Sequence, residues 1–207
     1  MSGERPFQIA LCILYSGYTL LRAHYRRAAR RPWIAGRPTG LDGIMLAILI
    51  PYEVLGLALY VLVPQWLAPG ALSLPFWLRW AGVIPGLAAL ALFGWSHHSL
   101  GANFSRSLQI RNGHSLVTNG PYRWVRHPMY TAFYLLHAAV FLLSANAILG
   151  LTWIAGLTLV LAVRVRREER MMLRAFGPIY RRYMRRTGRF LPRLSSLHER
   201  APGQAIP

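Results

Sequence analysis

Residues 129–163 read MYTAFYLLHAAVFLLSANAILGLTWIAGLTLVLAV and contain no charged side chain. A hydrocarbon core about 30 Å thick is crossed by about 20 helical residues, so this block is too long for one crossing. Asn146 lies near its centre and predicts a helical hairpin with two arms of about 16 residues. Each arm would measure roughly 24 Å, which neighbouring helices or local bilayer thinning must accommodate. The block therefore predicts an all-α, polytopic membrane protein.

Three further apolar runs precede the hairpin. They cover Phe7–Leu21, Gly43–Val63 and Phe76–Trp95. The first could be a signal peptide by length, but its arginines follow the apolar core and no small-residue cleavage site comes next. We therefore expect about five transmembrane helices in a single membrane domain over residues 1–207, with three spans within 1–96.

Composition excludes two other classes of protein. The 207 residues are 54% hydrophobic and only 14% charged, which is too apolar for an ordinary soluble domain or a disordered chain. Cys12 is the single cysteine, so no internal disulfide can form.

The charge pattern predicts an orientation in the membrane. All 24 basic residues are arginines against 6 acidic ones, a net charge of +18. Nucleic acid is the usual partner of such a basic chain, but these arginines flank apolar runs, which favours anionic lipid and no nucleic acid. Twenty-two of them fall after the first span, between the third and fourth spans, or after the fifth. The positive-inside rule then puts the N-terminus outside and the C-terminus in the cytoplasm.

A polar segment rich in aromatic residues, glycine and histidine separates the third and fourth spans, from His97 to Tyr130. Pro128 fits the first turn of the fourth helix, so Arg126, His127 and Tyr130 should gather where that helix enters the membrane. A helix N-terminus there favours a negatively charged ligand group.

A second polar segment starts as the fifth span ends. Arg164 and Glu168 are four residues apart and share one helix face, and Leu173 and Phe176 continue an amphipathic stripe. By composition alone, this segment could be simply an amphipathic helix that lies on anionic lipid. The histidines show no recognised metal-ligand spacing, so we expect no metal site.

Taken in order, these pieces resemble the isoprenylcysteine carboxyl methyltransferase and phospholipid methyltransferase group of integral membrane enzymes. The resemblance covers roughly residues 101–192. It rests on Gly101-Ala-Asn103-Phe104, His114-Ser-Leu-Val117, Gly120-Pro-Tyr122, Arg126-His127-Pro128-Met-Tyr130, Arg164, Glu168-Glu169, Phe176-Gly177, Tyr180, Tyr183 and Pro192. We expect a methyltransferase core over 97–192, formed by a loop, the hairpin and a C-terminal amphipathic helix, and a flexible tail over 193–207.

The resemblance implies S-adenosylmethionine as cofactor, with S-adenosylhomocysteine as product, in a cytosolic pocket built from the 97–130 segment and the C-terminal helix. The positions that match cofactor-contacting residues are Gln109, His114, Ser115, Leu116, Val117, Tyr122, His127, Pro128, Met129, Tyr130 and Glu168. Arg164 matches an arginine near the acceptor, as a catalytic and substrate-binding residue, and Arg126 lies in the active-site Arg-His-Pro element. The lipophilic or prenylated acceptor would enter from the bilayer.

Several acceptors and activities stay open at this stage. Isoprenylcysteine carboxylate leads, because a carboxylate is already ionised and needs only an orienting cation such as Arg126 or Arg164. A phospholipid amine would need a base, for which Glu168, Glu169, His114 and His127 are the candidates, and a small thiol is a further option. The alternatives are an NADPH-dependent reductase of the sterol reductase type and a non-enzymatic protein that binds anionic lipid. Glu53, inside the second span, could orient a substrate or hydrogen-bond another helix.

Overall fold

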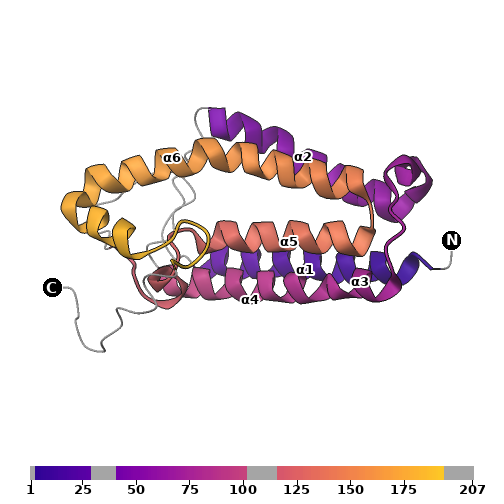
Figure 1. The fold of residues 1–207 in the computed structure, drawn as a ribbon, viewed down its shortest axis with the longest axis horizontal. Coiled ribbons are helices and arrows are strands. Elements are labelled where there is room, and N and C mark those ends of the chain that lie inside the picture. The colour runs from indigo at the N-terminus through magenta and orange to yellow at the C-terminus, as the bar shows by residue number, and fades with distance from the viewer. Residues whose placement is uncertain (1–2, 29–40, 102–115, 194–207) are drawn as a thin grey trace.

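The computed structural model describes residues 3–28, 41–101 and 116–193, and its long helices run side by side (Figure 1). The elements in chain order are α1 (Arg5–Ala28), α2 (Leu41–Leu62), η1 (Pro64–Gly70), α3 (Phe76–Ala81), α4 (Val83–Leu100), η3 (Gly120–Arg123), α5 (Pro128–Ser144) and α6 (Ala147–Arg186). Over these residues the fold is helical, as the sequence predicts.

The predicted hairpin is confirmed and turns at Ala145 and Asn146. Ala145 adopts a left-handed conformation with φ 46°, which ends α5. Asn146 then caps α6, because its side-chain oxygen accepts from the Leu149 amide at 3.1 Å. The other side-chain atom, Nδ2, donates to the Leu67 carbonyl at 2.7 Å and ties the turn to η1.

The third predicted run is confirmed as one candidate span, Phe76–Leu100. It is divided into α3 and α4 at Gly82, which keeps right-handed helical angles (φ −60°, ψ −20°), and α4 continues past the predicted end to Leu100. A Cβ atom on Gly82 would lie only 2.8 Å from Leu142 Cβ, so the glycine allows a close approach to α5. Pro85 falls in the first turn of α4, where no backbone donor is needed.

Several of the helices are apolar enough to lie in a membrane. By length and composition, three candidate spans are found among the described residues, at Gly43–Leu62, Phe76–Leu100 and Ala147–Arg186, with α5 as a shorter apolar helix. The protein is therefore an integral membrane protein. The predicted first span, Phe7–Leu21, lies in α1, which does not meet this criterion, so the count of five spans stays a prediction.

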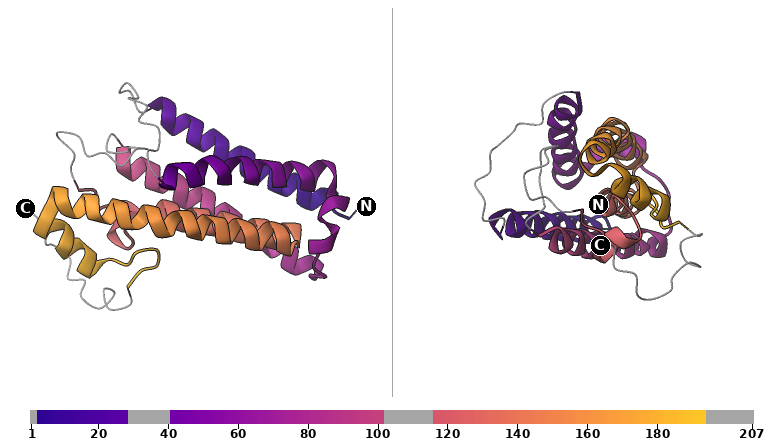
Figure 2. Two further views of the ribbon diagram at one scale, coloured as in Figure 1. Left: turned by 90° about the horizontal axis from the view of Figure 1, so that it is seen from above. Right: turned by 90° about the vertical axis from the view of Figure 1, so that its left-hand side faces the viewer.

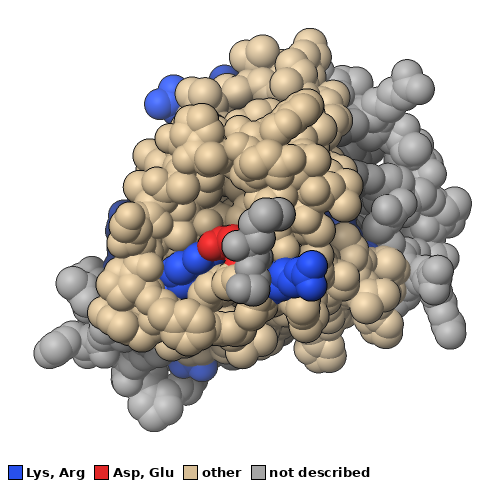
Figure 3. All heavy atoms as spheres, turned by 90° about the vertical axis from the view of Figure 1, so that its right-hand side faces the viewer, with Lys and Arg blue, Asp and Glu red and all other residues tan. Residues whose placement is uncertain are grey.

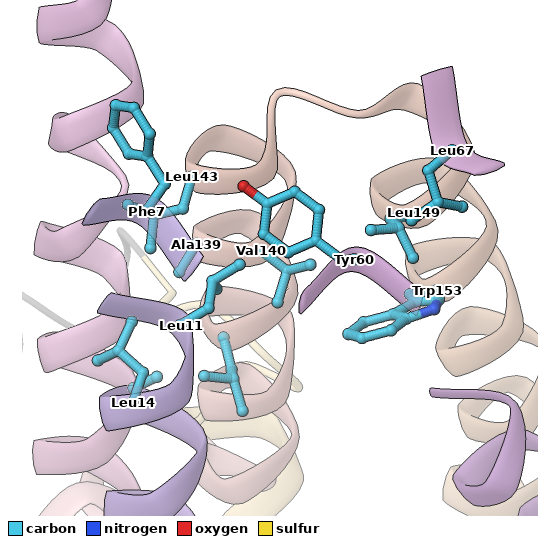
Figure 4. Packing of buried hydrophobic residues seen from close by; sticks show 12 residues of the cluster. Phe7, Leu11, Leu14, Tyr60, Leu67, Ala139, Val140, Leu143, Leu149 and Trp153 are labelled. Atoms are coloured by element: carbon cyan, nitrogen blue, oxygen red, sulfur yellow. The ribbon is translucent and has the colours of Figure 1, made fainter. Parts of the chain in front are cut away.

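Despite its composition, α1 is part of the bundle core. Phe7, Leu11 and Leu14 are almost fully buried, and Figure 4 shows them facing α5 side chains such as Leu143. Trp153 from α6 is completely buried in the same cluster. Side chains from α1, α2, α4, α5 and α6 thus share one hydrophobic core.

The last helix is longer than the sequence predicts. The second arm of the hairpin continues without a break into the amphipathic segment as α6, whose part before Gly177, residues 147–176, measures roughly 45 Å and exceeds a bilayer core. The chain reverses at Gly177, which has φ 49° and ψ −123°, so that the final turns through Arg186 fold back (Figures 1 and 2). This reversal brings the last turns of α6 alongside the polar end of the bundle.

The two ends of the bundle differ in charge. Figure 3 shows that the end nearest the N-terminus is almost uncharged apart from a central group. Glu4 and Arg79 form an ion pair there at 2.7 Å, and Arg79 also donates to the Leu143 carbonyl at 2.8 Å. The described parts of the three arginine-rich segments lie at the opposite end (Figure 1). This grouping agrees with the predicted orientation, which itself stays untested.

Candidate functional site at the arginine-rich end of the bundle

The segment before α5 is held by the chain that follows α6. The Arg126 amide donates to the Gly188 carbonyl at 2.9 Å, and the His127 amide donates to the Arg189 carbonyl at 3.1 Å. The Gly188 amide donates back to the Trp124 carbonyl at 3.1 Å. These bonds join two segments about 60 residues apart and fix the backbone at the start of α5.

The side chain of Arg126 connects these backbone hydrogen bonds to Glu169 on α6. Its Nε atom lies 3.0 Å from Glu169 Oε1, and both side chains are only 6% exposed. Its Nη1 atom donates to the carbonyls of Met184 and Thr187, which are among the unpaired carbonyls at the end of α6. Arg126 therefore fixes the fold-back of α6 as well as the position of Glu169.

His127 lies between the two glutamates. Its Nδ1 is 3.4 Å from Glu168 Oε2, and its Nε2 is 3.5 Å from Glu169 Oε1. The ring also stacks on Tyr130, with a centroid separation of 5.4 Å and an interplanar angle of 11°. The Nε2 atom is buried and makes no hydrogen bond.

Glu168, Tyr130 and Arg164 form a second chain of hydrogen bonds. The Tyr130 hydroxyl donates to Glu168 Oε1 at 2.5 Å and accepts from Arg164 Nε at 2.8 Å. Arg164 Nε also lies 3.1 Å from Glu168 Oε1, as their spacing of four residues on one helix face predicts. The structure thus brings together, at these three side chains, the two segments that are predicted to build the pocket.

Arg189 completes the cluster, and the sequence analysis did not identify it. Its Nη2 donates to Glu169 Oε2 at 2.6 Å and its Nε to Oε1 at 3.2 Å. Glu169 was considered only as a candidate base, although it is the more buried of the two glutamates. Sequence spacing carries no signal for a pair that forms only after α6 reverses.

The cluster carries surplus positive charge. Burial by itself opposes ionisation of both glutamates, but the adjacent His127 and the nearby arginines lower the pKa of Glu168 and lower that of Glu169 to about 2. Burial likewise opposes charging of His127, yet the two carboxylates raise its pKa overall. Two carboxylates face Arg126, Arg164 and Arg189, so the group favours an additional anion.

The remaining predicted cofactor residues are placed as follows. Tyr122 is buried beside the cluster, and its carbonyl accepts from the Tyr183 hydroxyl at 2.6 Å. Pro128 is fully buried at the start of α5, and Met129, Leu116 and Val117 are half-buried. Gln109, His114 and Ser115 lie outside the described residues, as does most of the predicted tail over 193–207.

Within 3–28, 41–101 and 116–193, no group of three or more His, Cys, Asp or Glu side chains is placed to hold a metal ion. The fold and the cluster together define a helical integral membrane protein with a buried ionic site at one end of its bundle.

A family model matches part of the chain. Residues 82–174, just under half of the chain, match the model of the isoprenylcysteine carboxyl methyltransferase (ICMT) family. The match contains the start of α5, Arg164 and both glutamates, but not α1 or α2.

Curated relatives match over about half of this chain. The cobalt-zinc-cadmium resistance protein CzcN of Cupriavidus metallidurans is 36% identical over 124 residues, which cover 56% of this chain and 55% of that protein. The protein-S-isoprenylcysteine O-methyltransferase of Dictyostelium discoideum is 30% identical over 52% of this chain and 46% of its own length. The human protein-S-isoprenylcysteine O-methyltransferase is 27% identical over 56% of this chain and 42% of its own length. The chain thus spans about half the length of these relatives.

The fold also has a solved counterpart. The structure of the eukaryotic intramembrane Ras methyltransferase ICMT aligns with a TM-score of 0.62 over 88% of this chain and 67% of that one. Sequence identity in this alignment is 19%, so the similarity concerns the fold. It extends well beyond the residues that match the family model and therefore includes part of the N-terminal helices.

Proposed function

We propose that the chain transfers a methyl group from S-adenosylmethionine to a lipophilic acceptor, most specifically the carboxylate of an isoprenylcysteine-type molecule. The observation that carries this proposal is the cluster of His127, Tyr130, Arg164 and Glu168 where α5 begins and the apolar part of α6 ends. Its members come from the two segments that the family shares, and it lies where a cytosolic cofactor and a bilayer acceptor can meet.

The charges and hydrogen-bonding groups of the cluster fit this cofactor. S-adenosylmethionine supplies an activated methyl group on a sulfonium, and it also carries an amine and a carboxylate. Glu168 and the Tyr130 ring suit the positive groups, while the surplus arginine charge suits the carboxylate. The buried Nε2 of His127, which lacks a hydrogen bond, offers a further polar contact. Gln109, His114 and Ser115 are proposed to complete the pocket.

The electrostatics favour an acceptor that is already ionised. Because the pKa values of Glu168 and Glu169 are lowered, both are carboxylates at neutral pH and are weak bases. An ammonium acceptor would need one of them to take its proton. A carboxylate acceptor needs only orientation, which Arg164 can provide from the edge of the cluster. Orientation and close approach then supply much of the rate enhancement for in-line transfer.

The experiment is a methylation assay with the full chain in detergent or nanodiscs. Tritiated S-adenosylmethionine is incubated with N-acetyl-S-farnesylcysteine, and phosphatidylethanolamine and a long-chain thiol are run in parallel. We expect label in a base-labile methyl ester of the farnesylcysteine compound. Transfer only to the amine or the thiol would assign the acceptor to that class instead of the carboxylates. Binding of NADPH but not of S-adenosylhomocysteine would overturn the proposal.

Arg164→Ala supplies the internal test of the site. This variant should reduce turnover or raise the KM for the acceptor by at least tenfold, because it removes the orienting cation. Arg170→Ala is the matched control, since Arg170 is an exposed arginine on the same helix whose Nε donates to the Arg166 carbonyl at 3.1 Å. Equal kinetics in both variants would remove Arg164 from the site.

A further inference from the structure

The surface around the ionic site carries charge of one sign. Residues 116–193 contain 13 arginines and two glutamates, a net formal charge of +11 with histidine neutral. The two glutamates, Glu168 and Glu169, lie inside the cluster, where their side chains are 19% and 6% exposed. Ten of the arginines are exposed, so the water-facing surface of this part of the chain is strongly positive.

Two of these arginines lie beside the site, on the part of α6 that folds back. Arg126 donates to the carbonyls of Met184 and Thr187, and Arg185 and Arg186 are the two residues between them. Both side chains are exposed. The backbone that carries them is therefore held within hydrogen-bonding reach of Arg126.

The chain after α6 brings two more arginines to the same place. Arg193 is exposed, and its Nη1 donates to the Arg185 carbonyl at 2.6 Å. Arg189 bonds to Glu169, yet 48% of its side chain remains exposed. Glu168 and Glu169 already bond to arginines inside the cluster and cannot offset these outer charges as well. The side of the site that faces water therefore repels cations and attracts anions.

This surface bears on any acceptor that is longer than a single residue. In the proposed function, Arg164 orients the carboxylate of an isoprenylcysteine, whose hydrocarbon part stays in the bilayer. Residues that precede the isoprenylcysteine then leave the site towards water, at the arginine-rich end of the bundle (Figure 1). Charges interact over about one Debye length, roughly 8 Å at physiological salt, so those residues interact with the arginines that they pass.

We propose that these exposed arginines select the acceptor by its charge, an inference that rests on the proposed function. The acceptors that bind are isoprenylcysteine compounds whose polar part is anionic or carries no charge beyond the carboxylate. Prenylated peptides with lysine or arginine next to the isoprenylcysteine are repelled, because bringing like charges together costs free energy. The surface thus narrows the class of acceptor without a specific contact to it.

The test compares two farnesylated tetrapeptides that differ only in charge, N-acetyl-Glu-Glu-Ser-farnesylcysteine and N-acetyl-Lys-Lys-Ser-farnesylcysteine, each with a free C-terminal carboxylate. Equilibrium binding to the full chain is measured without a methyl donor in nanodiscs of phosphatidylcholine, which has no net charge, and empty nanodiscs give the background. At about 50 mM salt, the acidic peptide should bind at least tenfold more tightly. At about 1 M salt, where the Debye length is about 3 Å, the preference should fall below twofold.

The double variant Arg185→Gln/Arg186→Gln removes two of the charges beside the site. It should reduce the preference for the acidic peptide at least threefold at low salt. Arg5→Gln is the matched control, because Arg5 is an exposed arginine at the start of α1, at the opposite end of the bundle. It should leave the preference unchanged.

The outcomes separate this inference from the proposed function. Equal binding of the two peptides at low salt, or a full preference in the double variant, would overturn the selection by these arginines. Tritiated S-adenosylmethionine then shows whether the bound acidic peptide is methylated. Binding of the acidic peptide without methylation would count against the proposed function and support the charge selection, whereas saturable binding of neither peptide would overturn both.

Discussion

At the scale of single residues, Glu168 and Glu169 are adjacent in sequence and have different partners. Glu168 contacts Tyr130 and Arg164, whereas Glu169 contacts Arg126 and Arg189. Successive helical residues point about 100° apart, so each glutamate faces a different set of neighbours. We therefore predict that Glu168 contacts the ligand, whereas the ion pairs of Glu169 with Arg126 and Arg189 connect the start of α5 to the chain after α6.

Glu168→Ala should weaken binding of S-adenosylhomocysteine by about 10- to 100-fold, the loss expected for one charge-assisted contact. Calorimetric titration of the detergent-purified chain measures it. Glu168→Gln keeps the size of the side chain and an acceptor for the Tyr130 hydroxyl but loses the negative charge. Its affinity should therefore lie between those of the unaltered chain and Glu168→Ala. Unchanged affinity in both variants would place Glu168 outside the cofactor pocket.

Glu169 should make stability depend on pH on the acid side. Its pKa is lowered from 4.5 to about 2 in the folded chain, so its stabilising contribution is present above pH 4.5 and is lost as the pH falls towards 2. Thermal unfolding of the unaltered chain and of Glu169→Gln at pH 3, 4, 5 and 7 measures this contribution. The difference in Tm should be constant at pH 5 and above and shrink below it. A difference that does not change with pH would contradict this assignment.

At the scale of elements, the turn between α5 and α6 depends on Asn146. Asn146→Ala removes the cap of α6 and the bond to Leu67, and should destabilise the chain by about 1 to 3 kcal/mol. The midpoint of thermal unfolding in detergent gives the comparison. Gln65→Ala is the control, because Gln65 is exposed in η1 at the same end of the bundle. A Tm equal to that of the control would show that the turn does not need the cap.

The sequence predicts some of these elements better than others. The hairpin follows from local features, an uncharged block interrupted by Asn146, and it is confirmed. The family resemblance predicts that the segments of Tyr130 and Glu168 build one pocket; the structure brings these two side chains into contact, while the pocket itself stays a prediction. The clamp between Arg126 and Gly188 could not be predicted, because it forms between distant segments only after α6 reverses.

Gly177 determines whether the end of α6 can fold back. Its φ of 49° and ψ of −123° belong to a region that residues with a Cβ rarely adopt, although a Cβ there would meet no atom within 4 Å. Gly177→Ala should therefore cost about 1 to 3 kcal/mol through the backbone alone. It should also increase proteolysis after Arg181 or Arg182 and weaken S-adenosylhomocysteine binding.

Gly94→Ala is the control for that experiment, because Gly94 is helical and its nearest neighbour, Leu21, would lie 3.9 Å from the new Cβ. It should leave proteolysis and binding unchanged. If Gly177→Ala behaved in the same way, the reversal of α6 would not depend on the glycine.

At the scale of the whole molecule, the two halves of the chain differ in how far they match a known family. The family match begins at residue 82 and includes the ionic cluster, whereas α1 and α2 lie outside it. These two helices nevertheless contribute Phe7, Leu11, Leu14 and Tyr60 to the same core as α5 and α6. The residues outside the family match therefore pack directly against the helices that carry the ionic cluster.

The charge asymmetry between the ends of the bundle predicts how the molecule lies in a membrane, and cysteine labelling can test it. Cys12→Ser removes the single cysteine. Ser73→Cys then marks the end near Glu4, and Asn119→Cys marks the arginine-rich end, since both residues are exposed. A membrane-impermeant maleimide should label Ser73→Cys in intact cells and Asn119→Cys only after permeabilisation, because arginines are retained on the cytoplasmic side. The reverse pattern would place the ionic site outside the cytoplasm, where S-adenosylmethionine made in the cell would not reach it, and would contradict the proposed function together with the orientation.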